Sequence, residues 1–320
     1  MTSKIGSLHH YKILVTGASG FLGSRLVKVL LEKGAFVVGV DYCNRFTQPI
    51  TDFTNHESFR FICGNFLEKL DEAGSLLLST KRKKSALFHM AGLANVKECE
   101  KNPSQAFESN VWLTYHALEF CRNNDVNKFI FPSTGLLYGD HHHRPVTEND
   151  PTIPKNLYIA TKVCAEALIQ GYARSFGISC KIARLGNVYG PGGNLDTLVG
   201  TLVKQVKTGE KIMIHDLTPV RDFIYIEDVI EGFLHLLISK DDTDFTIVNL
   251  STGTGTSVKK LAEIVCQVAG IPSDKIQSQN ISNNSISSLV LSNALLIKMT
   301  GWKQKYDLAK GLSLTLKKFN

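Results

Sequence analysis

The sequence predicts an α/β protein: a doubly wound parallel sheet with a smaller C-terminal α/β lobe. Three observations support this prediction. Short, almost continuously apolar segments recur along the first half of the chain, which is typical of strands covered on both faces. Segments with apolar residues at helical spacing separate them. After about residue 184 the loops lengthen and become rich in glycine, which indicates a change of architecture.

The expected elements follow in order. Each strand is an apolar run that ends at glycine or polar residues, and each helix fits the amphipathic pattern between two strands. We assign residues 1–185, with return segments near 221–250, to the sheet domain, and residues 186–320 mainly to a substrate-binding lobe. The expected strands are Tyr11–Thr16, Ala35–Asp41, Phe59–Cys63, Ala86–His89, Lys128–Pro132 and Ser179–Arg184, the helices are Phe21–Lys33, Pro103–Asn123 and Asn156–Phe176, and the return segments are Phe223–Ile226 and Phe245–Asn249.

Composition narrows the class of protein. The chain has 320 residues, of which 43% are hydrophobic and 20% charged, as in ordinary globular domains. No apolar run reaches the ~18–20 residues that cross a bilayer, and the seven cysteines lack CxxC spacing, so we expect no membrane partner, reduced thiols and a cytoplasmic location. The net charge of +7 is dispersed, which favours a small acidic ligand over nucleic acid. His141-His142-His143 has no partner cluster, so we expect no metal site.

A glycine-rich turn joins the first strand to the first helix, with the sequence Gly17-Ala18-Ser19-Gly20-Phe21-Leu22-Gly23. Such a turn lets the backbone approach a pyrophosphate, and the following helix N-terminus supplies N–H donors. We therefore predict a Rossmann-type domain in which Gly17, Gly20, Phe21 and Leu22 bind a dinucleotide. The spacing is GxxGxxG rather than GxGxxG, and a tight turn with close helix packing is the alternative.

Two residues at strand ends extend this predicted site. Asp41 ends the second strand, where a carboxylate can bind the adenosine ribose and repel a 2′-phosphate, so the cofactor is expected to be NAD rather than NADP. The alternative is an Asp that caps a turn, and the nearby Arg45 weakens the preference. Asn65 follows the third strand, where its amide could meet the adenine, although a plain turn is an equal alternative.

Tyr158 and Lys162 are four residues apart at the start of a predicted helix, so they share one face. A tyrosine with a pKa near ~10 is a poor base at neutral pH, and a nearby lysine favours its phenolate. Ser133 and Thr134 end the fifth strand, at the sheet edge where ligands bind. The sequence therefore predicts a proton-transferring tyrosine, assisted by Lys162 and Thr134, beside a dinucleotide.

At this point the chain resembles the extended short-chain dehydrogenases/reductases of the NAD-dependent epimerase/dehydratase family, which act on nucleotide sugars. The resemblance implies that Tyr158 is the acid/base and that Lys162 holds the nicotinamide ribose. The matching segments, spread over nearly the whole chain, are Thr16–Gly23, His89–Leu93, Asn110-Val111, Ser133-Thr134, Tyr138-Gly139, Tyr158–Lys162, Arg184–Pro191 and Arg221–Asp228.

The same resemblance assigns the remaining site residues. Thr134 would orient the sugar hydroxyl, with Ser133 beside it. Asn187 would contact the substrate, and Arg221 would pair with its diphosphate, because a guanidinium binds phosphate oxygens bidentately. Ala91 and Gly92 would let the backbone pack against NAD. A salt bridge from Arg221 to Asp222 or Asp228 is the alternative for that arginine.

Departures from the family pattern indicate which reaction is excluded. Sugar dehydratases follow the active-site Thr with an Asp-Glu pair, whereas Gly135-Leu136 stands here and cannot transfer protons. A second phosphate-binding arginine is replaced by the segment Ser282–Ser285. We therefore predict a nucleotide-sugar 4-epimerase with tightly bound NAD that works through a 4-keto intermediate.

Two other functions remain open from the sequence. One is an NAD(P)H-dependent reductase of nucleotide 4-keto-sugars, and the other is a nucleotide-binding regulatory protein without catalysis. The predicted helices Pro103–Asn123 and Asn156–Phe176 resemble those that form a four-helix dimer interface in this family, so we also expect a homodimer.

Overall fold

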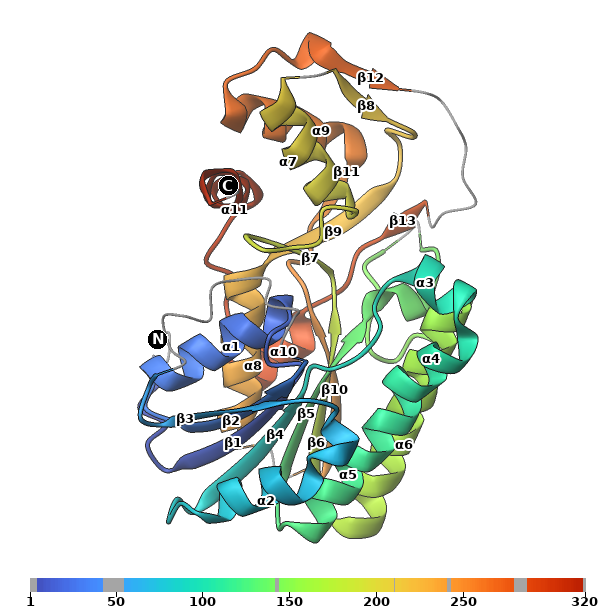
Figure 1. The fold of residues 1–320 in the computed structure, drawn as a ribbon. Coiled ribbons are helices and arrows are strands. Elements are labelled where there is room, and N and C mark those ends of the chain that lie inside the picture. Colours follow the sequence, from blue (N-terminus) through green and yellow to red (C-terminus); the bar gives the residue numbers. More distant parts are fainter. Residues whose placement is uncertain are drawn as a thin grey trace.

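The computed structural model describes residues 5–42, 55–141, 144–209, 211–240, 243–278 and 287–318. Its centre is a seven-stranded parallel sheet with the order β3–β2–β1–β4–β5–β6–β10, which confirms the predicted fold class (Figure 1). The strands are β1 (Tyr11–Thr16), β2 (Phe36–Asp41), β3 (Phe59–Cys63), β4 (Lys84–His89), β5 (Lys128–Thr134), β6 (Ser179–Leu185) and β10 (Phe245–Leu250).

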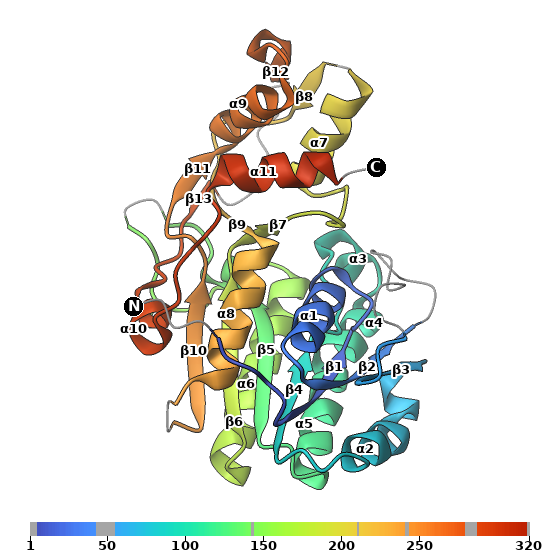
Figure 2. The same cartoon turned by 90° about the vertical axis from the view of Figure 1, so that its left-hand side faces the viewer.

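Helices cover both faces of this sheet, which explains why its strands are almost continuously apolar. α2 (Leu70–Leu78), α5 (Leu113–Asn123) and α6 (Leu157–Phe176) pack on one face. α1 (Phe21–Glu32) and α8 (Ile226–Ile238) pack on the other face and stand in front of the sheet in Figure 2. The strand order reverses between β1 and β4, so the crevice expected for a ligand lies beyond the carboxyl ends of these strands.

The C-terminal lobe stands beyond this same edge of the sheet (Figure 1). Its strand β9 (Val220–Tyr225) lies between β11 and β13 and also pairs with β7, which continues directly from β6. The remaining lobe elements are β7 (Asn187–Tyr189), α7 (Leu198–Thr208), β8 (Ile212–Ile214), β11 (Gly255–Ser257), α9 (Val258–Ala269), β12 (Ile276–Ser278), β13 (Ser288–Leu289) and α11 (Leu308–Lys317).

One predicted return to the main sheet is wrong. The segment Phe223–Ile226 belongs to β9 of the lobe sheet and to the first residue of α8, whereas Phe245–Leu250 does join the main sheet as β10. The segment Phe223–Ile226 is as apolar as a strand of the main sheet, because β9 is buried in the core that the lobe shares with the sheet domain. Apolarity alone therefore did not distinguish the two sheets.

The predicted helix Pro103–Asn123 is divided into three parts. α4 (Pro103–Phe107) passes into a π-helical turn, Glu108–Trp112, before α5 begins at Leu113. A π turn inserts one extra residue into the helical repeat and is frequent at functional sites. Here it buries Asn110, which bonds to the loop after β4 and to α6, as described below.

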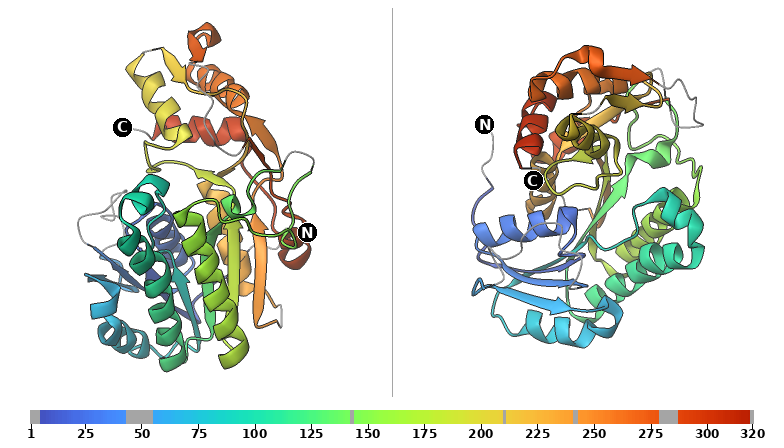
Figure 3. Two further views of the ribbon diagram at one scale, coloured as in Figure 1. Left: turned by 90° about the vertical axis from the view of Figure 1, so that its right-hand side faces the viewer. Right: turned by 45° about the horizontal axis from the view of Figure 1, so that its top comes forward.

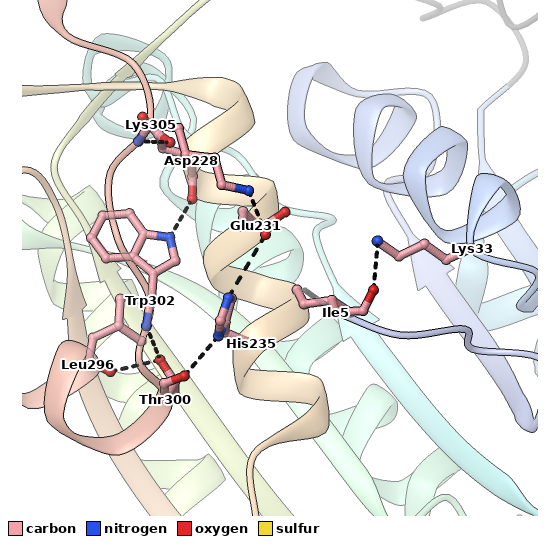
Figure 4. Close-up of polar contacts among 9 residues, drawn as sticks. All are labelled: Ile5, Lys33, Asp228, Glu231, His235, Leu296, Thr300, Trp302 and Lys305. Carbon is pink, nitrogen blue, oxygen red and sulfur yellow. Dashed lines mark hydrogen bonds and ion pairs between the residues drawn. The ribbon is translucent and has the colours of Figure 1, made fainter. Parts of the chain in front are cut away.

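A polar cluster ties the C-terminal segment to α8 (Figure 4). The Asp228 carboxylate accepts hydrogen bonds from the backbone N–H groups of Lys305 and Tyr306. The backbone carbonyl of Asp228 accepts a hydrogen bond from the Trp302 indole N–H at 3.1 Å. His235 lies 3.0 Å from the Thr300 carbonyl. Burial raises the pKa of Asp228 to about 6, because the charged carboxylate loses its hydration there.

Two expectations from composition can be compared with the structure. Cys63 is disulfide-bonded, so the prediction of reduced thiols is wrong for this residue. Five other described cysteines are free. In the described part of the chain, no helix has the length and apolarity to cross a bilayer.

Candidate active site

The glycine-rich turn after β1 forms a tight cradle at the start of α1. Gly17 has a φ of +66° and accepts a hydrogen bond from the Gly20 N–H at 3.1 Å. A Cβ atom at Gly17 would lie 2.6 Å from the backbone nitrogen of Ala91, so a larger residue there would force the loops after β1 and β4 apart. α1 begins at Phe21 with Gly20 as its N-cap, which leaves N–H groups directed to the crevice.

A cavity of about 410 Å³ lies beside this cradle. Most of the predicted cofactor-binding residues line it, namely Gly17, Gly20, Asp41, Asn65, Ala91 and Gly92. Phe21 and Leu22 do not line it and instead pack against the main core. The structure therefore brings six of the ten predicted cofactor-binding residues to this cavity, and Tyr158 and Lys162, the other two predicted residues, do not line it.

Asp41 also stabilises the glycine turn. Its carboxylate accepts hydrogen bonds from the Ser19 backbone N–H at 2.9 Å and from the Ser19 hydroxyl. The turn-capping role considered for this residue is thus present, while the same carboxylate lines the cavity. Asn65 likewise caps a turn, accepting from the Leu67 N–H at 3.1 Å. Arg45 lies outside the described residues.

His89 contacts the last residue of β1, directly before the glycine turn. It is fully buried, its Nδ1 lies 2.8 Å from the Thr16 hydroxyl, and its ring stacks on Phe131. Burial lowers the pKa of His89 to about 3, so the ring is neutral at physiological pH. This agrees with a packing role rather than acid/base catalysis.

Tyr158 enters the site from the first turn of α6. Asn156 caps this helix by accepting from the Ile159 N–H at 2.9 Å, which fixes where the helix begins. Tyr158 is buried, and burial raises its pKa to about 12; a hydrogen bond with the Thr134 side chain acts in the opposite direction. The structure thus brings Tyr158 into contact with Thr134, at the carboxyl end of β5.

Lys162 lies one turn further along α6 and is also buried. Its ammonium donates to the Pro132 carbonyl at 2.7 Å and stands 3.9 Å from the centre of the Phe131 ring. Burial lowers the pKa of Lys162 from 10.5 to about 7, and Glu166 partly opposes that shift. Lys162 is therefore held by the end of β5, the strand that carries Thr134.

A buried ion pair behind Lys162 was not found from the sequence. Arg184 at the end of β6 forms a bidentate pair with Glu166 of α6, at 2.7 and 3.2 Å, and donates to the Tyr138 hydroxyl at 2.8 Å. Tyr138 in turn donates to Asn249 of β10. Glu166 continues the four-residue spacing of Tyr158 and Lys162, and this spacing was the one sequence signal for Glu166. Its partner Arg184 lies 18 residues further along the chain, so the spacing does not indicate the ion pair.

Asn110 is a second residue whose role the sequence did not show. Its amide donates to the Leu93 carbonyl at 2.9 Å and to the Thr161 hydroxyl at 3.0 Å, while its oxygen accepts from the Leu93 N–H at 2.7 Å. These bonds fasten the loop after β4, which contains Ala91 and Gly92, to the helix that carries Tyr158.

A second cavity of about 300 Å³ lies between the carboxyl ends of β5 and β6 and the lobe. Thr134 and Asn187 line it, as predicted for substrate-binding residues. Ser133 does not line it; its hydroxyl is buried and has no hydrogen-bond partner among the described residues. The loop after β4 lines both cavities, with Leu93 in the first and Ala94 in the second, so the two cavities meet at this loop.

Arg221 stands on β9, half-buried, with Asp140 and Asp216 as its acidic neighbours. The carboxylate of Asp222 instead accepts hydrogen bonds from Thr252 and Gly253, and that of Asp228 from the C-terminal segment. Neither aspartate considered as a salt-bridge partner for Arg221 is therefore directed to it. The segment Ser282–Ser285 lies outside the described residues.

Comparison with known proteins is consistent with this geometry. The sequence model of the NAD dependent epimerase/dehydratase family matches residues 13–251. This chain belongs to that family.

Individual members of the NAD dependent epimerase/dehydratase family match nearly the whole chain. A putative UDP-glucose 4-epimerase of Methanocaldococcus jannaschii is 31% identical over 306 residues, covering 94% of this chain and 95% of that protein. A UDP-glucose 4-epimerase of Corynebacterium glutamicum is 33% identical over 279 residues, covering 82% and 81%. Among solved structures, UDP-glucuronic acid 4-epimerase from Bacillus cereus, in complex with UDP-glucuronic acid and NAD, has a TM-score of 0.86 at 26% identity, covering 96% and 98% of the two chains.

Proposed function

We propose that this protein is a nucleotide-sugar 4-epimerase that uses tightly bound NAD. The observation that supports the proposal is the contact between Tyr158 and Thr134, because Thr134 lines the second cavity. The first cavity contains the glycine turn, which suits a dinucleotide. The second cavity contains hydroxyl and amide side chains, which suit a sugar. The relatives described above are epimerases of nucleotide sugars, and the solved neighbour holds NAD.

Two features of the first cavity fit NAD, and Lys162 of α6, which is not part of its lining, adds a third. Gly17 and Gly20 line it beside the N-terminus of α1, where backbone N–H groups can bind a pyrophosphate. The Asp41 carboxylate would accept hydrogen bonds from the adenosine ribose and disfavour a 2′-phosphate. The buried Lys162 would donate to the nicotinamide ribose. When bound, NAD supplies a hydride acceptor that can return the hydride later.

The residues of this chain then supply the proton chemistry. Tyr158 removes the proton of the sugar 4-hydroxyl as hydride leaves C4, and Thr134 orients that hydroxyl. Burial holds the Tyr158 pKa high, so formation of its phenolate depends on nearby positive charge; the Lys162 ammonium would supply it. Tyr158 would return the proton to the 4-oxygen when the rotated 4-keto sugar is reduced on its other face.

The residues after Thr134 favour epimerisation over elimination. Gly135 and Leu136 line the second cavity and carry no group that can accept or donate a proton. A dehydratase needs an acid and a base near C5 and C6, and these two positions, directly beside Thr134, provide neither.

The proposal is tested by incubating the freshly purified protein with UDP-, GDP-, CDP- and dTDP-sugars, without added cofactor, and separating the products by chromatography. Conversion of one sugar to its C4 epimer would support self-contained redox chemistry. No conversion even with added NAD, together with reduction of a nucleotide 4-keto-sugar by NADH or NADPH, would replace the proposal by the reductase alternative.

We also propose a homodimer formed through α5 and α6, which stand side by side with α4 in the left view of Figure 3. This face carries the exposed apolar side chains of Phe107, Trp112 and Phe176. Phe176 also lines a hollow on α6 together with Ala167 and Gly171, small residues that permit close helix contact. Exposed apolar patches of this kind usually mark an interface.

A further inference from the structure

One wall of the first cavity is helical, and the sequence did not connect it with the cofactor. The glycine turn and the carboxyl ends of β2, β3 and β4 supply the other lining residues. Trp112 is the one aromatic residue of the helical wall, and 44% of it is exposed. The helical wall comes from α4, the π turn and α5, and consists of Gln105, Glu108, Ser109, Trp112 and Leu113.

The order of groups in NAD directs its adenine to this wall. In the proposed function, on which this inference rests, the pyrophosphate lies at the glycine turn and the adenosine ribose at Asp41. The adenine is attached to that ribose on the side away from the pyrophosphate, so it lies nearer to β3. The turn Asn65–Leu67 after β3 lines the cavity there. Phe66 of this turn packs against Phe120 of α5 with ring centres 5.9 Å apart, so α5 stands beside the space for the adenine.

Neighbouring rings hold Trp112 in place. Its indole stacks on Tyr115, with ring centres 5.2 Å apart and planes 24° apart, and meets His116 edge-on at 4.7 Å. Asn110 fixes the π turn itself through its hydrogen bonds to the loop after β4 and to α6. An aromatic ring has two faces, so an indole that stacks on one neighbour can stack on a base through the other. Binding to a ring already held in position loses less conformational freedom.

We propose that Trp112 binds the adenine of the cofactor by stacking and that the π turn Glu108–Trp112 positions it for this role. The extra residue of a π turn changes which side chains of the following helix reach the cavity. Stacking acts on the flat face of the purine, whereas the amide of Asn65 would act on its edge. The two residues lie on opposite walls of the cavity and therefore contribute separately to the affinity for NAD.

Calorimetric titration of the full-length protein, freed of cofactor, with AMP, ADP-ribose and nicotinamide mononucleotide tests the proposal. Trp112→Ala is expected to weaken the binding of AMP and ADP-ribose by about 10- to 100-fold, the usual loss when a base-stacking ring is removed. Trp112→Phe keeps an aromatic face and is expected to bind both within about threefold of the parent. Unchanged AMP affinity in Trp112→Ala, or an equal loss for nicotinamide mononucleotide, would overturn the inference.

Phe107→Ala is the matched control, because Trp112 also belongs to the proposed dimer face. Phe107 is an exposed aromatic residue on that face and does not line the cavity. We expect Phe107→Ala to bind AMP like the parent. Equal losses of AMP affinity in the two alanine variants would show that Trp112 acts through the contact between subunits, and the stacking role would be rejected.

Tryptophan fluorescence reports the stacking directly. The chain has two tryptophans, and the second, Trp302, is fully buried. An adenine stacked on the indole quenches its emission, so AMP should quench the parent and leave Trp112→Phe unchanged. The same quenching in both proteins would contradict the proposal.

These measurements also separate this inference from the proposed function. Loss of AMP binding in Trp112→Ala, in a protein that epimerises none of the nucleotide sugars, would reject the proposed function and retain the role of Trp112. Epimerisation by the parent, with unchanged AMP affinity in Trp112→Ala, would retain the proposed function and reject the role of Trp112.

Discussion

Tyr158 is the residue on which the proposed chemistry depends most directly. Replacing it by Phe removes one hydroxyl from a buried ring and leaves the glycine cradle unchanged. We expect kcat to fall by roughly 10²–10⁴-fold, the usual contribution of a general acid/base, while NAD remains bound. Product chromatography and the absorbance of released cofactor measure these two quantities. Tyr306→Phe, in the C-terminal segment, is the control and should retain activity; substantial turnover by Tyr158→Phe would contradict the assignment.

Lys162 gives a prediction about stability and pH. Its pKa in the folded protein is lowered to about 7 from 10.5, so between these values the unfolded chain binds more protons than the folded one. The free energy of unfolding of the cofactor-free protein should therefore rise with pH in this window, by up to about 1.4 kcal/mol per pH unit, and the contribution is lost as pH falls to about 7.

Lys162→Met removes this titration, so denaturant unfolding of parent and variant at several pH values isolates it. We expect the variant to be the more stable protein at pH 7 and the difference to shrink towards pH 10. Parallel pH profiles for the two proteins would show that Lys162 is not held in a desolvating environment.

At the scale of single residues, the sequence was sufficient to predict the features that depend on local spacing. The four-residue interval of Tyr158 and Lys162 is sufficient to place both on one face of α6, and the glycine turn is sufficient to predict the cradle. The contact between Tyr158 and Thr134 required the additional rule that ligands lie beyond the carboxyl ends of strands. Pairing of Glu166 with Arg184 depends on how α6 packs on β6, which no local pattern specifies.

At the scale of elements, the buried pair between Glu166 and Arg184 fastens α6 to β6. Both side chains are less than a tenth exposed. Glu166→Gln leaves the Arg184 charge buried without its partner and is expected to lower the free energy of unfolding by about 3–5 kcal/mol. Glu263→Gln is the control, because Glu263 pairs with Lys260 on the exposed side of α9, away from the proposed dimer interface.

For that surface pair the expected loss is below about 1 kcal/mol. Urea denaturation of the three proteins measures both values, and equal losses would contradict the distinction between buried and exposed pairs.

The strands of the main sheet were predicted to within one or two residues, because their apolar runs end at polar residues or glycine. The helices α2 and α8 and most elements of the lobe were not predicted, and two predicted segments differ from the structure. The π turn Glu108–Trp112 keeps the apolar spacing of an α-helix on both sides, so the pattern does not reveal the inserted residue. β9 was assigned to the wrong sheet because burial between two layers produces the same apolar run as burial within one sheet.

At the scale of the whole molecule, the proposed dimer predicts a mass of twice 35.4 kDa in solution. Ala167 is exposed on α6 within the apolar face, so Ala167→Arg should leave the fold intact and separate the subunits. Ala309→Arg introduces the same charge on the exposed face of α11 and should remain dimeric. Light scattering after size-exclusion chromatography measures the mass, and a monomeric parent would reject the proposal.

The two cavities differ in how their residues are distributed along the chain. Every residue that lines the first lies between Thr16 and Leu113, whereas the second draws on segments from Ala94 to Leu291. Evolution can therefore change the cofactor preference and the sugar preference by different routes. Cofactor preference can be altered within one contiguous stretch of the gene, for example by a single recombination event. A new sugar preference requires coordinated substitutions in several separate stretches.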